Sequence, residues 1–365
     1  MDMTEAMLDA LDRLSDTGPE YREILANHGP MAAEALVRLG RGEAVSRWVE
    51  QYKRKLTPQP VAVDRIEPSE WQRYLGQPRF LGDWTVLMRR ELSERSWSAM
   101  LARWWPRLLP GLAASATHGV IRTAHAVRSL ANAGNDPHPL LLDELARGLA
   151  FWAARYQTLP GAPSLTGNVT AVVAVANLPR LDPDLDAPEP GIIGRLRLLP
   201  SLPSFSSALD RWKAPSDPHM ALAELISAAA RVVAVRDDPP IAYCHTVTGP
   251  AAVRMTLSQL PESLWWPSVA ATWQVIGGII SVFAAPRQDG ESSPAPLSEP
   301  PTDDTFYDLA ELAVAHGDEH VIKLTEAAIR EYRIIEDQTL LAAVDRFAPG
   351  SQRIFEATLV RRICR

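Results

Sequence analysis

The sequence predicts a mostly α-helical protein, built as a single large domain with proline-rich connections. Helical periodicity dominates the chain, and the alternating patterns typical of β-strands are scarce. The clearest case is the start, where Met7, Leu8, Leu11 and Leu14 recur at the spacing of one helical face. The chain has 365 residues, and 46% of them are hydrophobic, which is enough for a substantial core.

The expected helices follow in order along the chain. Periodic segments cover residues 4–14, 32–55, 84–105, 111–133 and 140–156. Pro106 should end the third of these helices and Gly134 the fourth. An apolar run around residues 275–285 is too short to span a bilayer and predicts a buried helix. The last predicted helix, over residues 318–332, has the sequence DEHVIKLTEAAIREY.

Three stretches rich in proline interrupt the helices, over residues 58–78, 181–203 and 287–303. The last of them, RQDGESSPAPLSEPPTD, is so poor in apolar residues that we expect a mobile loop. Histidines lie on both sides of the second and third stretches. This distribution favours one composite site within a single domain over residues 1–365.

Composition and charge argue against several classes of function. The net charge is −7 and no basic tract is present, so we expect no nucleic-acid partner. The two cysteines, Cys244 and Cys364, lie far apart, which is typical of a cytoplasmic protein without a disulfide framework. The first residues lack the basic start and apolar core of a signal peptide, and we expect no membrane association. A dinucleotide fingerprint, a phosphate-binding loop and a nucleophile elbow are all missing, so NADPH could act only without a recognisable binding motif.

The last predicted helix carries the most unusual pattern in the chain. His320 and Lys323 share a face with aliphatic residues, where an amphipathic helix would ordinarily be apolar throughout. Either this pair is half-exposed or the fold needs its nitrogens inside. In the first case, Lys323 pairs with Glu319 or Glu326 on a solvated turn, and Asp318 caps the helix.

Six of the eight histidines lie where they could bind a metal, namely His28, His118, His125, His245, His316 and His320. His118 and His125 are seven residues apart on one helical face, with Arg122 between them. Neutral imidazole is a common ligand of iron, zinc and copper. Short motifs do not decide the case, because Gly317 breaks the zinc-protease pattern HExxH and no repeated Glu-x-x-His is present. A metal site of two histidines and one carboxylate remains possible. The alternative is that the histidines bind no metal and are core residues with ordinary hydrogen-bond partners.

Five segments together resemble the questin oxidase-like family. They are NHGPMAAEAL near the start, GDW, HGVIRTAHAVR, CHTVTGP and DEHVIKLTEA, in family order over nearly the whole chain. The resemblance implies a mostly helical fold and a mononuclear non-haem iron held by four histidines and a carboxylated lysine. On this chain the implied metal ligands are His28, His118, His245, His320 and Lys323. The fungal members open a ring of anthraquinone-type polyketides with molecular oxygen.

The function implied by the resemblance is that of an Fe(2+)-dependent oxygenase that cleaves a ring of a small aromatic substrate with O2. Arg122 and His125 are the candidates to face the cavity and polarise a carbonyl group or move a proton. Fungal relatives have a second histidine at the position of Arg122, which predicts a different pocket lining here. Trp84, Trp104 and Trp273 are weaker candidates to stack on the substrate, since core packing explains them more simply.

Two other functions are kept as alternatives. One is a helical small-molecule binding protein whose histidines are structural, and the other is a zinc-dependent hydrolase that uses the same cluster. A cysteine nucleophile at Cys244, next to His245, is a much weaker hypothesis, because neighbours in sequence need not face each other.

Overall fold

The computed structural model describes residues 3–22, 25–182, 184–235, 241–283 and 300–348. Within these residues there are sixteen α-helices and one two-stranded sheet, which confirms the predicted mostly α-helical fold. Five short 3-10 helices are η1 (Trp71–Tyr74), η2 (Pro78–Phe80), η3 (Leu109–Gly111), η4 (Leu199–Ser201) and η5 (Glu262–Leu264). Of the predicted mobile loop, residues 287–299 lie outside the described part of the chain.

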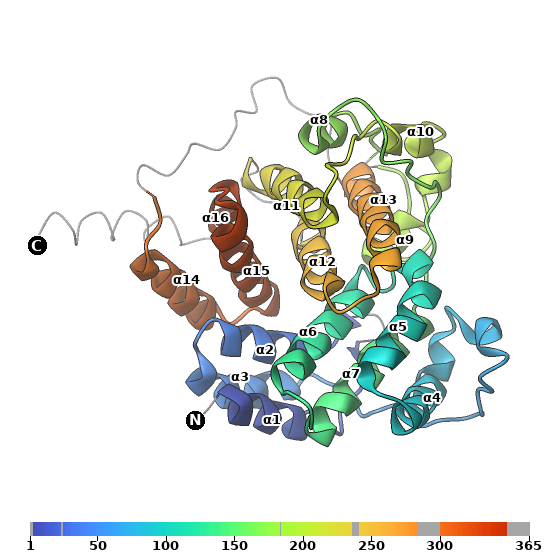
Figure 1. Ribbon diagram of the computed structural model, residues 1–365, viewed down its shortest axis with the longest axis vertical. Helices are drawn as coiled ribbons and strands as arrows, with labels where there is room; N and C mark the ends of the chain where they lie inside the picture. The colour runs from blue at the N-terminus through green and yellow to red at the C-terminus, as the bar shows by residue number, and fades with distance from the viewer. Residues whose placement is uncertain (1–2, 23–24, 183, 236–240, 284–299, 349–365) are drawn as a thin grey trace, which may run out of the picture.

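The first helices form one end of the molecule, drawn in blue in Figure 1. They are α1 (Met3–Arg13), α2 (Gly29–Arg38) and α3 (Gly42–Lys53), and each packs against the other two. An antiparallel pair of short strands, β1 (Glu20–Tyr21) and β2 (Leu25–Ala26), precedes α2. The single helix predicted over residues 32–55 is in fact two, because Gly40 has a positive φ of 74° and turns the chain between them.

The next four helices are α4 (Leu81–Glu94), α5 (Trp97–Leu108), α6 (His118–Asn132) and α7 (Pro139–Ala154). α7 packs against both α6 and α4. The helix predicted over residues 84–105 is divided at Ser96, whose hydroxyl caps α5 by accepting the N–H of Ala99. Pro106 does not end α5, which continues through this residue to Leu108. The helix predicted over residues 111–133 starts only at His118, because residues 115–117 have a left-handed backbone.

The third group comprises α8 (Ala171–Ala176), α9 (Gly191–Leu196), α10 (Phe205–Leu209), α11 (Pro218–Ala234), α12 (Ala242–Leu257) and α13 (Trp265–Phe283). The predicted connection over residues 181–203 thus contains the short helix α9 and the 3-10 helix η4. The apolar run predicted as a buried helix belongs to α13. By length and composition the segment Glu262–Phe283 could cross a membrane, but 67% of its apolar window is buried inside the protein, as in a core helix.

The last helices are α14 (Asp303–His316), α15 (Glu319–Ile335) and α16 (Thr339–Phe347). α15 packs against α2, α12, α14 and α16, so the last part of the chain joins the first. Figure 1 shows this arrangement, with α15 beside α12 and its first turn close to α2. α15 is the helix predicted from residues 318–332, and its central position places its polar face inside the protein.

Tryptophans fill much of the core. Six of them are fully buried: Trp84, Trp104, Trp105, Trp152, Trp212 and Trp273. The rings of Trp84 and Trp104 meet edge to face with their centroids 5.7 Å apart, a favourable geometry for aromatic pairs. The indole N–H of Trp273 donates to the carbonyl of Leu209 at 2.8 Å. Core packing therefore accounts for Trp84, Trp104 and Trp273.

Candidate metal centre

α15 presents His320 and Lys323 from its first two turns. The carboxylate of Asp318 accepts the backbone N–H of His320 at 2.8 Å and that of Val321 at 3.4 Å, which confirms the predicted cap. The same oxygen lies 3.2 Å from Nδ1 of His320. Because a carboxylate only accepts hydrogen bonds, Nδ1 carries the proton and the lone pair of His320 is on Nε2.

His28 lies at the N-cap of α2, with Pro30 in the first turn of the helix. Its backbone N–H donates to the phenol oxygen of Tyr52 on α3 at 2.8 Å. The side chain is buried, and its Nδ1 has no hydrogen-bond partner among the described residues.

His118 is the first residue of α6 and follows Ser115, Ala116 and Thr117, whose φ angles are 47°, 55° and 71°. This left-handed turn brings the carbonyl oxygen of Ser115 to 2.5 Å from Nδ1 of His118. A carbonyl only accepts, so Nδ1 is protonated and Nε2 is left with its lone pair. That Nε2 is buried and, in the described part of the chain, unpartnered.

His245 lies inside α12. The helix continues past this residue through Gly249 and Pro250 to Leu257. Gly249 is one helical turn after His245, and a Cβ there would lie only 3.3 Å from Oγ1 of Thr117. The glycine therefore allows α12 to approach the left-handed turn closely, which brings His245 next to His118.

The four imidazoles form one cluster. Ring centroids are 4.4 Å apart for His28 and His118, 4.5 Å for His28 and His320, and 4.5 Å for His118 and His245. The fourth side of the cluster, between His245 and His320, measures 5.8 Å. One nitrogen from each of His28, His118 and His320 lies within 4.8 Å of the others, close enough to hold a metal ion. Residues from α2, α6, α12 and α15 thus converge on one point.

The electrostatics of the cluster suit neutral ligands. Burial, reinforced by the nearby Lys323 and the other imidazoles, keeps the pKa values of His28, His118 and His245 well below the ordinary value. Burial also lowers the pKa of His320, although the hydrogen bond to Asp318 opposes this. Buried polar nitrogens without partners are costly in a protein interior. A metal ion would satisfy them, so the donor set fits a metal.

Lys323 is buried among these histidines, with 1% of its surface exposed. Its Nζ has no hydrogen-bond partner among the described residues. The predicted ion pairs with Glu319 and Glu326 are wrong, because Glu319 pairs with Lys55 at 3.0 Å and Glu326 pairs with Arg128 at 2.5 Å. Burial lowers the pKa of Lys323, which favours the neutral amine.

Arg122 and His125 both contact buried carboxylates outside the cluster. The guanidinium of Arg122 binds both carboxylate oxygens of Glu144 on α7, at 2.6 and 2.8 Å. Nδ1 of His125 lies 2.8 Å from a carboxylate oxygen of Glu34 on α2. These contacts tie α6 to its neighbours, and a catalytic role for either residue stays a prediction.

A cavity of about 210 Å³ adjoins the cluster, and all four histidines line it. Most of its other walls are aliphatic and come from β2, from the start of α9 and from Ile241. Tyr21, Arg155 and Glu189 add polar groups. Neither Arg122 nor His125 lines this cavity. An apolar space next to convergent polar groups is typical of a small-molecule site.

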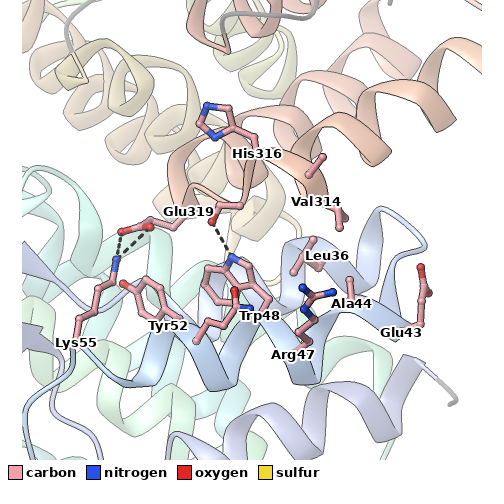
Figure 2. Close-up of a pocket in the computed structure, with 13 residues that line it drawn as sticks. Leu36, Glu43, Ala44, Arg47, Trp48, Tyr52, Lys55, Val314, His316 and Glu319 are labelled. Carbon is pink, nitrogen blue, oxygen red and sulfur yellow. Dashed lines mark hydrogen bonds and ion pairs between the residues drawn. The ribbon is translucent and has the colours of Figure 1, made fainter.

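A second hollow, a cleft of about 660 Å³, lies between α3 and the junction of α14 and α15 (Figure 2). α3 forms one wall with Trp48 and Tyr52, and the junction of α14 and α15 forms the other with His316 and Glu319. His316 is exposed there and does not belong to the histidine cluster.

Cys244 does not suit a nucleophile. It is fully buried, and burial raises the pKa of its thiol to about 11, so the thiolate is scarce near neutral pH.

Two residues that hold the histidines of the cluster in place were not predicted from the sequence. Ser115 contributes a backbone carbonyl, which any residue could supply, and Tyr52 acts through a contact between residues far apart in the chain.

The family model described as questin oxidase-like matches residues 26–328 of the chain. The four clustered histidines and Lys323 all fall within the matched part. No curated protein matches the chain.

Proposed function

The chain belongs to the questin oxidase-like family, and from this premise we propose that it is a non-haem iron oxygenase. Family membership supports an oxygenase-type oxidoreductase in general. The finer proposal is oxidative cleavage of an aromatic polyketide or anthraquinone-like ring. The observation that carries it is the convergence of buried imidazoles with unpartnered nitrogens beside a buried lysine amine.

His28, His118, His245 and His320 are proposed to hold Fe(2+), with Lys323 as the fifth ligand after carboxylation. The neutral amine of Lys323 would add to the carbon of CO2 and lose a proton to a neighbouring imidazole or water. The resulting carbamate is anionic and offers oxygen ligands, whereas an ammonium has no lone pair to offer. Bound iron(II) would supply the activation of molecular oxygen.

The protein itself would position and shield the reacting groups. The carbonyl of Ser115 and the carboxylate of Asp318 fix the protonated nitrogens of His118 and His320, as second partners of metal-bound histidines commonly do. Aliphatic walls would hold the ring of a small aromatic substrate and exclude water. Arg122 and His125 remain proposed catalytic residues, and their contacts with Glu144 and Glu34 would also keep α6 and its ligand His118 in place.

Electrons would come from the substrate or from an external reductant such as NADPH. The proposed location is the cytoplasm, without a nucleic-acid or membrane partner.

A zinc-dependent hydrolase is the second candidate. Three histidine nitrogens around one point are also the ligand set of many catalytic zinc sites. Metal quantification on the purified protein separates the two, with about one equivalent of iron expected. A protein with no metal under any loading condition would instead favour a binding protein with structural histidines.

The test of Lys323 uses two substitutions and CO2. Lys323→Ala should weaken Fe(2+) binding by about tenfold or more, because it removes the only anionic ligand proposed. Lys323→Glu should restore part of the affinity by supplying a carboxylate. Affinity is measured by competition with a chromophoric chelator, with and without added bicarbonate.

Bicarbonate should strengthen binding in the wild-type protein and leave Lys323→Glu unchanged. If wild-type affinity ignores bicarbonate and Lys323→Ala binds iron equally well, Lys323 is not a ligand. The mass of the anaerobically purified protein gives a second measure, since a carbamate adds CO2 to the chain.

A further inference from the structure

The cavity at the histidines has a buried inner part and an open mouth. The four imidazoles line the inner part, whereas Leu25 and Ile241, which are 43% and 50% exposed, line the part that reaches solvent. Both mouth residues are aliphatic. A ligand that enters between them meets apolar surface first and the imidazoles last, so the entrance favours an apolar molecule.

The charged groups of the cavity already have partners. Among the described residues, three charged side chains line it, and each forms an ion pair with a residue outside the lining: Arg155 with Glu20 at 2.6 Å, Glu189 with Arg197 at 3.0 Å, and Glu319 with Lys55 at 3.0 Å. An ionised ligand would lose its hydration here, and these paired side chains would not compensate its charge. The side chains of the cavity therefore favour an uncharged molecule.

The first turn of α9 forms one wall of the cavity, through Ile192 and Ile193. Arg195 fastens this helix by donating to three carbonyl oxygens at 3.2, 2.7 and 3.0 Å, those of Asp182, Leu185 and Val282. Gly194 packs so closely on Glu189 that a Cβ there would lie 1.7 Å from its carbonyl oxygen. α9 also packs on α13 (Figure 1). The wall is therefore fixed, and it limits the width of the cavity.

The volume of the cavity limits what can be enclosed. It is about 210 Å³, whereas an apolar cavity of about 150 Å³ in another protein holds a single benzene molecule. The space is thus sufficient for one substituted ring, and a second fused ring would reach into the mouth. A third fused ring would lie outside the mouth, in water.

We propose that the substrate of this chain presents an uncharged terminal aromatic ring, within a system of one or two fused rings, and that Ile192 and Ile193 set this limit. The ring enters past Leu25 and Ile241 and ends beside the imidazoles. The central ring of a three-ring molecule does not reach them, because its flanking ring would have to displace the wall formed by α9. The size limit is a property of the cavity, and only its meaning for the oxidised substrate rests on the proposed function.

The size limit is tested with two fluorescent alcohols, 2-naphthalenemethanol and 2-anthracenemethanol, which differ by one fused ring. Fluorescence titration measures their binding to full-length protein, as purified and again after treatment with a chelator. Enclosing a third ring would tighten binding by about tenfold, because it buries more apolar surface. In the wild-type protein this ring should stay in water, so we expect the two dissociation constants to agree to within about threefold.

The role of α9 is tested by a double variant, Ile192→Ala with Ile193→Ala, which enlarges the cavity at this wall. Anthracenemethanol should then bind about fivefold or more tightly than naphthalenemethanol. Both isoleucines are only partly buried, and a thermal midpoint near that of the wild type shows that the variant folds. The matched control is Ile334→Ala, since Ile334 is 54% exposed and lies outside the cavity lining. This control should leave the ratio of the two dissociation constants unchanged.

The proposal is overturned if anthracenemethanol already binds the wild-type protein tenfold more tightly than naphthalenemethanol, or if neither alcohol shows saturable binding. Equal ratios in the double variant and in Ile334→Ala would show that α9 sets no limit. In chelator-treated protein, 2-naphthoate should bind about tenfold or more weakly than the alcohol of the same shape, and tighter binding would overturn the uncharged class. Since these ratios do not depend on iron, a protein that takes up no iron but shows them loses the oxygenase and keeps the size limit.

Discussion

At the scale of single residues, the charges around Arg128 show how closely the site depends on buried ion pairs. Arg128 of α6 binds Glu34 of α2 and Glu326 of α15, and all three side chains are at least mostly buried. Burial alone would raise the pKa of Glu326, but the charges of Arg128 and Arg330 lower it to about 2. Both carboxylates are thus ionised at neutral pH and need their cations. Since α2, α6 and α15 each carry a histidine of the cluster, this ionic group also fixes their spacing.

We expect Arg128→Met to lower the free energy of unfolding by about 3–5 kcal/mol, because it leaves two buried carboxylates without their shared cation. Arg38→Met is the matched control. Arg38 pairs with the same Glu34 at 2.9 Å but is 28% exposed, so its loss should cost about 1 kcal/mol or less. Urea denaturation measures both, and equal losses would contradict the importance assigned to burial.

At the scale of elements, the left-handed turn before α6 is the most unusual piece of backbone near the site. Ser115, Ala116 and Thr117 each adopt a conformation that costs an L-residue roughly 1–2 kcal/mol. The turn persists because Thr117 packs closely against Gly249 of α12 and because His118 binds the carbonyl of Ser115. Strain at a site of converging ligands is typical of a functional constraint.

Ala116→Gly should cost less stability than Ala114→Gly. Both changes remove a buried methyl group and give the unfolded chain more conformational freedom. Only residue 116 has a positive φ, a conformation that glycine adopts without strain. We expect the difference in free energy of unfolding, measured in urea on metal-free protein, to be about 1 kcal/mol. Identical losses at the two positions would mean that the turn carries no strain.

At the scale of the whole molecule, the candidate site joins segments that lie nearly 300 residues apart in the chain, from His28 to His320. A metal bound at this point cross-links α2, α6, α12 and α15, and it can bind tightly only to the folded state. Metal binding and folding should therefore be coupled.

Removal of metal with a chelator should lower the thermal midpoint of the wild-type protein. The free energy of unfolding should fall by about 2.7 kcal/mol if free metal had been present at a hundred times its Kd. His28→Ala should show no such response, because a ligand is missing. His316→Ala should respond like the wild type, since His316 is exposed and outside the cluster. A wild-type midpoint that does not move with chelator would argue against a structural coupling of metal and fold.

Much of the fold could be predicted, because helix formation depends on contacts within one or two turns. The first helix, the helix at 140–156 and α15 agree with the structure to within a few residues. The wrong predictions concern the positions where helices begin and end. Nothing in the composition around Ala116 marks a left-handed turn, since it is held by Gly249 and not by residues that prefer such a conformation. The helix end predicted at Pro106 was wrong for the opposite reason, because α5 continues through this proline to Leu108.

That His320 and Lys323 share one face of a helix capped by Asp318 could be read from the chain alone, since these relations depend only on helical spacing and on hydrogen bonds within one turn. The residues that this face contacts depend on how the whole chain folds. In the folded protein, Glu319 forms an ion pair with Lys55, and Glu326 forms one with Arg128. Three further imidazoles gather with His320, and Lys323 is buried without a carboxylate partner. The partners of a charge depend on burial and on residues hundreds of positions away, and no local pattern contains that information.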